Sequence, residues 1–461
     1  MIRLIIFGLL FLGSLLTIFR APTNLLWYVS ILMTEFCWVF IGMIAVLIFW
    51  RNGAPSFQLW GTILGLLALV LFFVPIVQAY SLSKKLQKDF AKAFPLIKNE
   101  NNAVPFRPIQ MISGIGSAKI DYKTVLYDKT DGLYLDFYPS TKKGSKPCIV
   151  VIHGGSWAAG DSKQLPELSS ALAKDGYHVA NINYRLAPRQ HYPAPIEDVQ
   201  QAIYFLKNAS SELQIDSSQF ILLGRSAGGQ IALSAAYTLP EKSIKGVVCF
   251  YGPTDMVWGY ENPTSPLVLD SRKVMQDYLG GTLGEARDQY INSSATETVT
   301  AHTPPTLLIY GENDPLVSPR HGNRLSVKLR EKSIPFFELY LPWATHAFDY
   351  TLNGPGGQLS TWTVRKFLKA VLQQSNTTIS SNHINHQQQQ QLVRTPAKPY
   401  RFSFAQPLQP PHEPCVIDDV SSRIVIYLCV FVFLTIKIFA RSVDARDFVH
   451  EHPLTAIFFH I

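Results

Sequence analysis

The sequence predicts an α/β domain in which a mostly parallel central sheet carries helices on both faces, preceded by transmembrane helices. Short β-rich runs alternate with helical stretches between residues 119 and 374, a pattern typical of parallel sheets. One of these runs leads into a Gly-x-Ser-x-Gly turn at residues 224–228. Long apolar blocks fill residues 1–80. Together these observations predict one α/β domain joined to a membrane region.

Six short runs of β-branched and aliphatic residues are predicted to be the strands of the sheet. Helical periodicity between them predicts covering helices, for example over residues 165–174 and 196–207. The predicted strands are 148–152, 179–182, 220–223, 247–251, 306–310 and 336–341.

The length and composition indicate more than one structural unit. The chain has 461 residues, of which 47% are hydrophobic and only 16% are charged, a high apolar share for a soluble protein. The predicted units are a membrane region (1–80), a juxtamembrane linker (81–118), the α/β domain (119–374), a disordered low-complexity linker (375–422), an apolar segment (423–440) and a tail (441–461).

Three apolar blocks in the N-terminal region predict two or three uncleaved transmembrane helices. Blocks 25–50 and 57–80 are each long enough to cross roughly 30 Å of hydrocarbon, and the polar turn 51–56 joins them as a helical hairpin. Block 4–19 is short for a span and resembles a signal sequence, although no clear small-residue cleavage site follows it. The positive-inside rule favours a cytoplasmic α/β domain, whereas a signal-like first block favours the opposite side.

The C-terminal region is polar before it becomes apolar again. Residues 375–422 are rich in Gln, Asn, Ser and Pro, with a glutamine run at 387–391, which predicts a disordered linker. Residues 423–440 are apolar but slightly short and interrupted by Lys437, so a transmembrane helix and an interfacial or buried helix are both open.

The charge and cysteine patterns argue against several kinds of partner. The formal net charge is +8, yet no basic motif with interleaved aromatic residues accompanies it, so no nucleic-acid partner is expected. A lysine cluster after the last N-terminal apolar block suits anionic lipid head groups as well as a solvated helix face. The five cysteines have neither metal-site nor disulfide-framework spacing, so no metal is expected. Nothing in the sequence sets the oligomeric state.

The Gly-x-Ser-x-Gly turn identifies Ser226 as the candidate nucleophile. Residues 220–223 form an apolar strand before the turn, and a helix of small residues follows it. The flanking glycines allow the tight strand-to-helix turn that exposes a serine Oγ at the top of a sheet. The pattern alone occurs by chance in many chains. The assignment of Ser226 therefore depends on the strand before the turn and the helix after it.

Backbone donors for a developing oxyanion are predicted at two places. The strand 148–152 runs directly into HGGSW at 153–157, whose glycines let backbone N–H groups approach a substrate. Gly154 and Gly155 are therefore candidate donors, together with Ala227, the residue after the nucleophile. We expect His153 to shape this loop by hydrogen bonding and not to act as a base.

An acid and a base are expected to follow later strands. Asp314 lies on the loop after the fifth predicted strand, with Glu312 as the competing carboxylate on the same loop. His346 follows the sixth predicted strand and is expected beside Asp314. The order Ser, Asp, His, each after its own strand, is the strongest signal in the sequence. His302 and His321 lack such a position and are interpreted as incidental.

These residues together predict acyl transfer by a serine nucleophile. His346 would take the proton of Ser226 as the serine attacks an acyl carbonyl, and Asp314 would fix the imidazole tautomer. Water would then hydrolyse the acyl-enzyme, so neither a metal nor an organic cofactor is required.

Four spaced motifs carry a family resemblance. They are HGGSW at 153–157, YRLAP at 184–188, YPAPIED at 192–198 and GRSAGG at 224–229. They resemble the esterase/lipase group of α/β-hydrolases, related to hormone-sensitive lipase, carboxylesterases and feruloyl-esterase-like enzymes. The resemblance covers about residues 120–373 and implies an α/β-hydrolase fold that hydrolyses carboxylic esters. We interpret the YRLAP motif and Asp198 as structural.

Two related groups narrow the expected substrate. Isoprenylcysteine methylesterase-like enzymes join this domain to N-terminal membrane helices, whereas kynurenine formamidase-like enzymes carry the same loop in proteins that are typically soluble. The resemblance therefore favours a small-molecule or lipid-like ester presented at a membrane. Ser156 stands where the lipase-like majority has a third glycine. Ser156 and Trp157 are expected to contact the substrate, with Trp157 at the entrance.

Other functions stay open at this point. The first alternative is an acylamide hydrolase of the kynurenine formamidase type, and the second is a non-catalytic binding protein with a hydrolase fold. Such binding proteins usually lack a member of the triad. Residues 255–300 are expected either to form a partial cap over the site or to pack as a helical excursion. A transporter is disfavoured, because only Glu35 would place a charge inside a predicted span.

Overall fold

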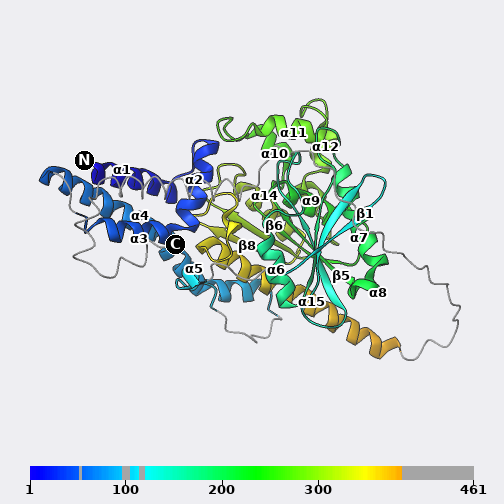
Figure 1. Cartoon of the computed structure of the whole chain (residues 1–461). Coiled ribbons are helices and arrows are strands. Elements are labelled where there is room, and N and C mark those ends of the chain that lie inside the picture. The colour runs from blue at the N-terminus through cyan, green and yellow to red at the C-terminus, as the bar shows by residue number, and fades with distance from the viewer. Residues whose placement is uncertain (51–53, 96–103, 114–119, 387–461) are drawn as a thin grey trace.

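The computed structural model describes residues 1–50, 54–95, 104–113 and 120–386. Its centre is an eight-stranded sheet (Figure 1). The strands are β1 Lys123–Asp128, β2 Leu133–Tyr138, β3 Lys146–Ile152, β4 His178–Ile182, β5 Ile215–Arg225, β6 Ile244–Phe250, β7 Thr306–Gly311 and β8 Phe336–Leu341. Their order in the sheet is β1-β2-β4-β3-β5-β6-β7-β8. β2 pairs antiparallel with both β1 and β4, and all the other neighbours pair in parallel.

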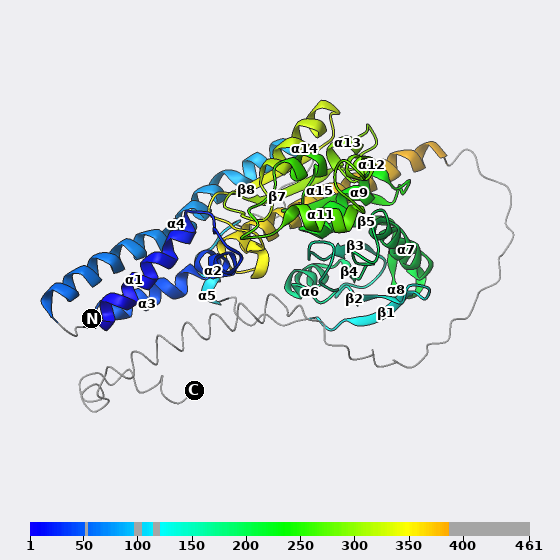
Figure 2. The ribbon, with the colours of Figure 1, turned by 90° about the horizontal axis from the view of Figure 1, so that it is seen from above.

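Helices cover both faces of the sheet (Figures 1 and 2). They are α5 Gln110–Ser113, α6 Pro166–Asp175, α7 Ala194–Asn208, α8 Ser210–Leu213, α9 Ala227–Thr238, α10 Met256–Glu261, α11 Ser271–Leu279, α12 Arg287–Asn292, α13 Ala295–Thr298, α14 Arg320–Glu331, the 3-10 helix η2 Phe348–Tyr350 and α15 Pro355–His386. Gly229 of α9 lies against Cys249 of β6, whereas Gly246 of the same strand lies against Phe367 of α15. Since Gly246 and Cys249 differ in parity along the strand, α9 and α15 cover opposite faces. The predicted α/β fold class is confirmed.

All six predicted strands are present, and an edge pair is added to them. β8 has the predicted bounds, and β5 begins at Ile215, earlier than predicted. The sequence did not indicate β1, the edge strand, or β2, which pairs between β1 and β4 and is buried at every residue except Tyr134. An edge strand such as β1 lacks the continuous apolar run that marks a central parallel strand.

The N-terminal helices form an arm that projects from the α/β domain (Figures 1 and 2). They are α1 Ile2–Ser14, the 3-10 turn η1 Leu15–Thr17, α2 Asn24–Glu35, α3 Cys37–Leu47 and α4 Pro55–Ala93. α1 packs along α4, where the ring of Phe7 lies directly against Gly65. A small residue at this position lets the two helices approach closely.

One helix of the arm, α4, is long and apolar enough to cross a membrane. Block 25–50, predicted as a single span, is instead the two helices α2 and α3, bent by 76° at the break between them. Glu35, at the C-terminal end of α2, is fully buried and accepts the N–H of Gly356 at 2.8 Å. α2 therefore packs on the α/β domain, and a second span exists only if the bent pair is counted as one.

The first part of the predicted juxtamembrane linker 81–118 is helical, because α4 continues through it to Ala93. Phe90 of α4 packs edge-to-face against Phe337 of β8 and Trp362 of α15, with ring centroids 5.0 and 6.2 Å apart. A single helix thus belongs to both the arm and the core of the domain.

At the other end, α15 continues to His386. Residues 375–386, predicted as the start of a disordered linker, are therefore helical. The rest of that linker, the apolar segment 423–440 and the tail 441–461 lie outside the described residues.

Candidate active site

Ser226 occupies a sharp turn between β5 and α9. Its backbone has φ +53° and ψ −121°, and its N–H donates to the carbonyl of Phe250 at 2.9 Å. A Cβ at Gly224 would meet the carbonyl oxygen of Gly228 at 2.0 Å, and one at Gly228 would meet that of Ile152 at 2.2 Å. Since no side chain fits at either position, the glycines permit the strained turn that presents the serine.

Asp314 and His346 form a buried pair on the loops that follow β7 and β8. Nδ1–H of His346 donates to Oδ2 of Asp314 at 2.6 Å. Oδ1 of Asp314 accepts the backbone N–H groups of Leu316 and Val317 at 2.8 and 2.9 Å. The aspartate is therefore held on both oxygens, and the competing carboxylate of Glu312 belongs to an exposed residue. This pairing leaves Nε2 as the free ring nitrogen for proton exchange.

A second buried ion pair lies behind the histidine. The ring of Tyr251 is 4.3 Å from that of His346, centroid to centroid. Its hydroxyl donates to Asp349, which also accepts Nε–H of Arg225 at 2.5 Å. Arg225 precedes Ser226 in the chain, so this network joins the nucleophile turn to the loop of the base. Burial raises the pKa of the Tyr251 hydroxyl well above its ordinary value, which keeps it a neutral donor.

One predicted donor of the HGGSW loop has a partner within the protein. The N–H of Gly154 donates to Oε1 of the Gln164 side chain at 2.8 Å. Gly155 has φ +122°, and a Cβ there would lie 1.9 Å from the carbonyl oxygen of Ala159. Ala227 is the first residue of α9, where the backbone N–H has no partner within the helix. Gly155 and Ala227 remain the candidate donors.

Trp157 lies in the wall of the site and not at its entrance as predicted. Its Nε1–H donates to Oε1 of Gln230 at 2.9 Å, and its ring stacks on Tyr278 with an interplanar angle of 4°. Both Ser156 and Trp157 have positive φ values, of 53° and 60°. The loop is therefore held in a strained shape by packing and by the buried amide of Gln230.

A cavity of about 770 Å³ opens beside Ser226. Asp314, Ser156 and Trp157 also line it. α10 and α11 contribute Trp258 and Met275 to its wall, so residues 255–300 are both a packed helical excursion and part of a cover over the site. Ser226, Ala227 and Asp314 thus share the wall of one space of ligand size.

Sequence comparisons point to one family. The family model described as BD-FAE matches residues 135–329. Probable carboxylic ester hydrolase LipM of Mycobacterium tuberculosis is 29% identical over 45% of this chain and 50% of its own length. Esterase LipC of the same organism is 28% identical over 54% of this chain and 65% of its own length.

The chain has the α/β-hydrolase fold and is similar to esterases with that fold. This α/β-hydrolase matches only one half to two thirds of the length of these two curated relatives. Among solved structures it is similar to the Pyrobaculum calidifontis esterase, with TM-score 0.49 and 18% identity over 62% of this chain and 92% of the other. The metagenomic carboxylesterase EstE1 gives TM-score 0.49 and 19% identity over 64% of this chain and 97% of the other.

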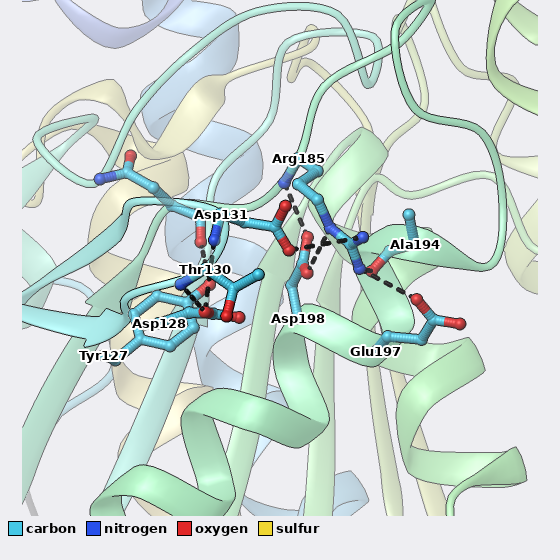
Figure 3. A network of polar contacts seen from close by, with 9 residues as sticks. Tyr127, Asp128, Thr130, Asp131, Arg185, Ala194, Glu197 and Asp198 are labelled. Atoms are coloured by element: carbon cyan, nitrogen blue, oxygen red, sulfur yellow. Dashed lines mark hydrogen bonds and ion pairs between the residues drawn. The ribbon is translucent and has the colours of Figure 1, made fainter.

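The YRLAP and YPAPIED motifs of this α/β-hydrolase build a polar network at the edge of the sheet (Figure 3). Nε of Arg185 binds Asp198 at 2.7 Å, and Nη2 binds Glu197 at 2.9 Å. Nη1 lies 3.6 Å from Asp131, in the turn between β1 and β2. Burial raises the pKa of Asp198 to about 6, against the opposing effect of the arginine. None of these four residues is among the described residues that line the cavity.

The arm supplies site residues that the sequence did not indicate. Arg20, Ala21 and Pro22 line the cavity of the α/β-hydrolase. Nε1–H of Trp27 donates to the carbonyl oxygen of His346 at 3.0 Å. Nothing in the local sequence relates residue 27 to residue 346, because the contact arises only when the arm folds back onto the domain.

Two further buried histidines have different positions: His153 lies within the HGGSW loop, and His321 lines the cavity. Nδ1–H of His153 donates to the carbonyl of Gly154 at 2.7 Å and its ring stacks on Tyr184, the structural position expected from the sequence. His321, interpreted as incidental, lines the cavity, and its Nδ1 accepts the N–H of Thr254 at 3.2 Å. Burial lowers the pKa of both imidazoles to about 4.

Proposed function

We propose that this protein is a membrane-anchored serine hydrolase that cleaves carboxylic esters through Ser226, Asp314, His346 and an acyl-enzyme intermediate. The observation that carries the proposal is the buried Asp314–His346 pair beside a cavity that also contains Ser226 at a strained turn. The relatives named carboxylic ester hydrolase and esterase support the same reaction class.

The acylation step follows from these positions. Nε2 of His346 takes the hydroxyl proton as Oγ of Ser226 attacks the carbonyl carbon, and Asp314 stabilises the imidazolium that forms. The N–H groups of Gly155 and Ala227 face the oxyanion, each contributing about 3 kcal/mol to transition-state stabilisation. The imidazolium then protonates the leaving alcohol, which departs with its oxygen.

Deacylation repeats the step with water. His346 takes a proton from the water as it attacks the acyl carbon, and returns that proton to Oγ of Ser226 when the acid leaves. The network of Arg225, Asp349 and Tyr251 keeps the loop of the base in place behind the ring.

A lipid-like ester suits the surface around the cavity. Leu267 lines the cavity and is 71% exposed, and Phe19, next to the lining residue Arg20, is 60% exposed. Exposed apolar side chains continue along the arm, which supports insertion of the arm into a membrane. They include Leu9, Leu12, Val46, Phe49, Leu59, Trp60 and Val70.

The test uses the full-length protein in detergent. We expect labelling by a fluorophosphonate probe and turnover of p-nitrophenyl esters, both abolished in Ser226→Ala and both retained in Ser218→Ala, a serine on the exposed surface of β5. A wild-type protein that neither labels nor turns over any ester would refute the proposal and favour a binding protein. Faster turnover of N-formylkynurenine than of every ester would instead favour the acylamide hydrolase.

A further inference from the structure

The segment from Arg20 to Glu35, which contains α2, contacts the loops after β7 and β8 and the cover of the cavity at Leu267 and Val268. We propose that this arm segment is a working part of the active site: Trp27 positions the loop of His346, and Ala21 shapes one wall of the substrate cavity. The inference rests on the proposed ester hydrolysis. It assigns the N-terminal region a role in turnover in addition to anchoring.

Trp27 acts on the base through the backbone. Its indole is buried, Nε1–H donates to the carbonyl oxygen of His346 at 3.0 Å, and the two rings meet edge-to-face with centroids 6.0 Å apart. The next residue, Ala347, has φ +63°. A non-glycine residue in that region is strained, so the peptide between His346 and Ala347 needs an external contact to keep its orientation. The indole N–H supplies this contact.

The same segment binds the loop of the acid. Nε and Nη2 of Arg20 both donate to the carbonyl oxygen of Glu312, at 3.2 and 2.8 Å. Glu312 lies two residues before Asp314 in the chain. Leu316, whose N–H binds Asp314, packs against the hydrophobic cluster of the arm. The loops that carry Asp314 and His346 therefore both contact the arm.

The cover of the cavity is attached at the same place. The backbone N–H of Asn24 donates to the carbonyl of Leu267 at 2.9 Å, and its side-chain amide donates to the carbonyl of Val268 at 3.1 Å. Ala21 is buried and lines the cavity, together with Leu267 and Val268. A larger side chain at position 21 would thus take space from the substrate.

The first experiment replaces the indole and keeps a ring, with Trp27→Phe. We expect kcat for a soluble aryl ester to fall about tenfold while KM stays within about twofold, because the base is displaced and the cavity is kept. The fluorophosphonate rate constant should fall by the same factor, with the final labelled fraction unchanged. Trp60→Phe, on an exposed position of α4, should leave every value unchanged.

Three results would overturn the positioning role. Trp27→Phe could label and turn over at wild-type rates, or its labelled fraction could fall while the rate constant of the labelled part stays the same, as in a purely structural defect. The third is a wild-type result for Arg20→Gln, an exposed variant that does not threaten the fold, where we expect a kcat loss of about threefold. An unlabelled wild-type protein would refute the proposed function itself, which is a different outcome.

The second experiment tests the wall with Ala21→Leu. We expect KM to rise with acyl length, from about unchanged for acetate to roughly tenfold for an eight-carbon chain, because the added side chain occupies the cavity. The matched control is Ala45→Leu on the exposed face of α3, which should behave as wild type with every ester. Equal KM values for Ala21→Leu and wild type across the series would refute the wall assignment.

Discussion

The buried histidines around the cavity differ in what faces their ring nitrogens. Nδ1 of His346 faces the carboxylate of Asp314, whereas Nδ1 of His153 faces a carbonyl and Nδ1 of His321 accepts a backbone N–H. A carboxylate stabilises the charged imidazolium, while burial without one favours the neutral ring. This contrast supports the proposal that His346 is the base, and it leads to a prediction for each kind of histidine.

Asp314→Asn should lower kcat by about 10³- to 10⁴-fold, because an amide facing Nδ1 permits the wrong tautomer and gives the imidazolium no charge partner. The melting temperature should change little, since the amide oxygen can still accept the N–H groups of Leu316 and Val317. Turnover of p-nitrophenyl acetate checks this, with the surface variant Asp216→Asn as control. A loss below about tenfold would remove Asp314 from the triad.

His321 should make stability fall in mild acid. Its pKa is about 4 when folded and about 6.5 when unfolded, so between these values the unfolded chain binds more protons. The contribution is absent above pH 6.5 and reaches roughly 3 kcal/mol of destabilisation near pH 4. His321→Asn keeps an acceptor for Thr254 and removes the titration, so its unfolding free energy should fall less between pH 7 and 4. Parallel pH profiles for the two proteins would contradict this.

The position of a site residue was predictable where the residue directly follows a predicted strand. It was not predictable where the contact comes from a segment far away in the sequence. Ser226, Asp314 and His346 each follow a predicted strand, so their meeting at one edge could be inferred. The role of Gly154 could not, because the acceptor that engages its N–H is the side chain of Gln164. Trp27 was read as part of an apolar span, since hydropathy does not reveal which domain a helix packs against.

At the scale of elements, α2 and α15 are joined by a carboxylate cap. Oε2 of Glu35 accepts the N–H of Gly356, in the first turn of α15, at 2.8 Å. The first N–H groups of a helix have no partner within it, and the carboxyl oxygen of Glu35 supplies an acceptor for one of them. Glu35, the acidic residue of block 25–50, therefore caps α15 from α2.

Glu35→Ala should destabilise the protein by about 1–2 kcal/mol, the usual effect of losing a helix cap. Glu35→Gln should cost less, since its amide oxygen can still accept the N–H of Gly356. Thermal unfolding in detergent measures both, with the exposed Glu212→Ala as the matched control. Equal melting temperatures for Glu35→Ala and Glu212→Ala would show that the contact contributes nothing.

The strands were predictable where apolar runs stand out in the sequence. β3 to β8 are parallel strands with such runs, and all were predicted. β1 was missed because it is an edge strand with one buried residue, Tyr127, and β2 was missed although all its residues except Tyr134 are buried. The helical continuation of α4 past residue 80 was missed because its lysines were read as the end of the apolar block.

At the scale of the whole molecule, the exposed apolar side chains at the cavity, Leu267 and Phe19, form a rim that we expect to contact lipid. This rim predicts that soluble esters and esters in a membrane respond differently to a charged substitution. Leu267→Asp should lower turnover of a long-chain ester in vesicles about tenfold, because a charge on the rim opposes contact with lipid, and should leave a short soluble ester within about twofold. Tyr204→Asp, at an exposed position on α7, is the control. An equal loss with both esters would contradict a lipid-facing rim.

The shared helix α4 sets where such an enzyme can act. At 1.5 Å per residue its 39 residues extend about 58 Å, from the far end of the arm into the packing around Phe90. In the proposed membrane-anchored form, a domain carried on one helix stays at one height above its own bilayer, unlike a domain on a flexible tether, which samples a volume. Its substrates would therefore come from the ring of lipids around its own helices, and esters in an apposed membrane would lie beyond its reach.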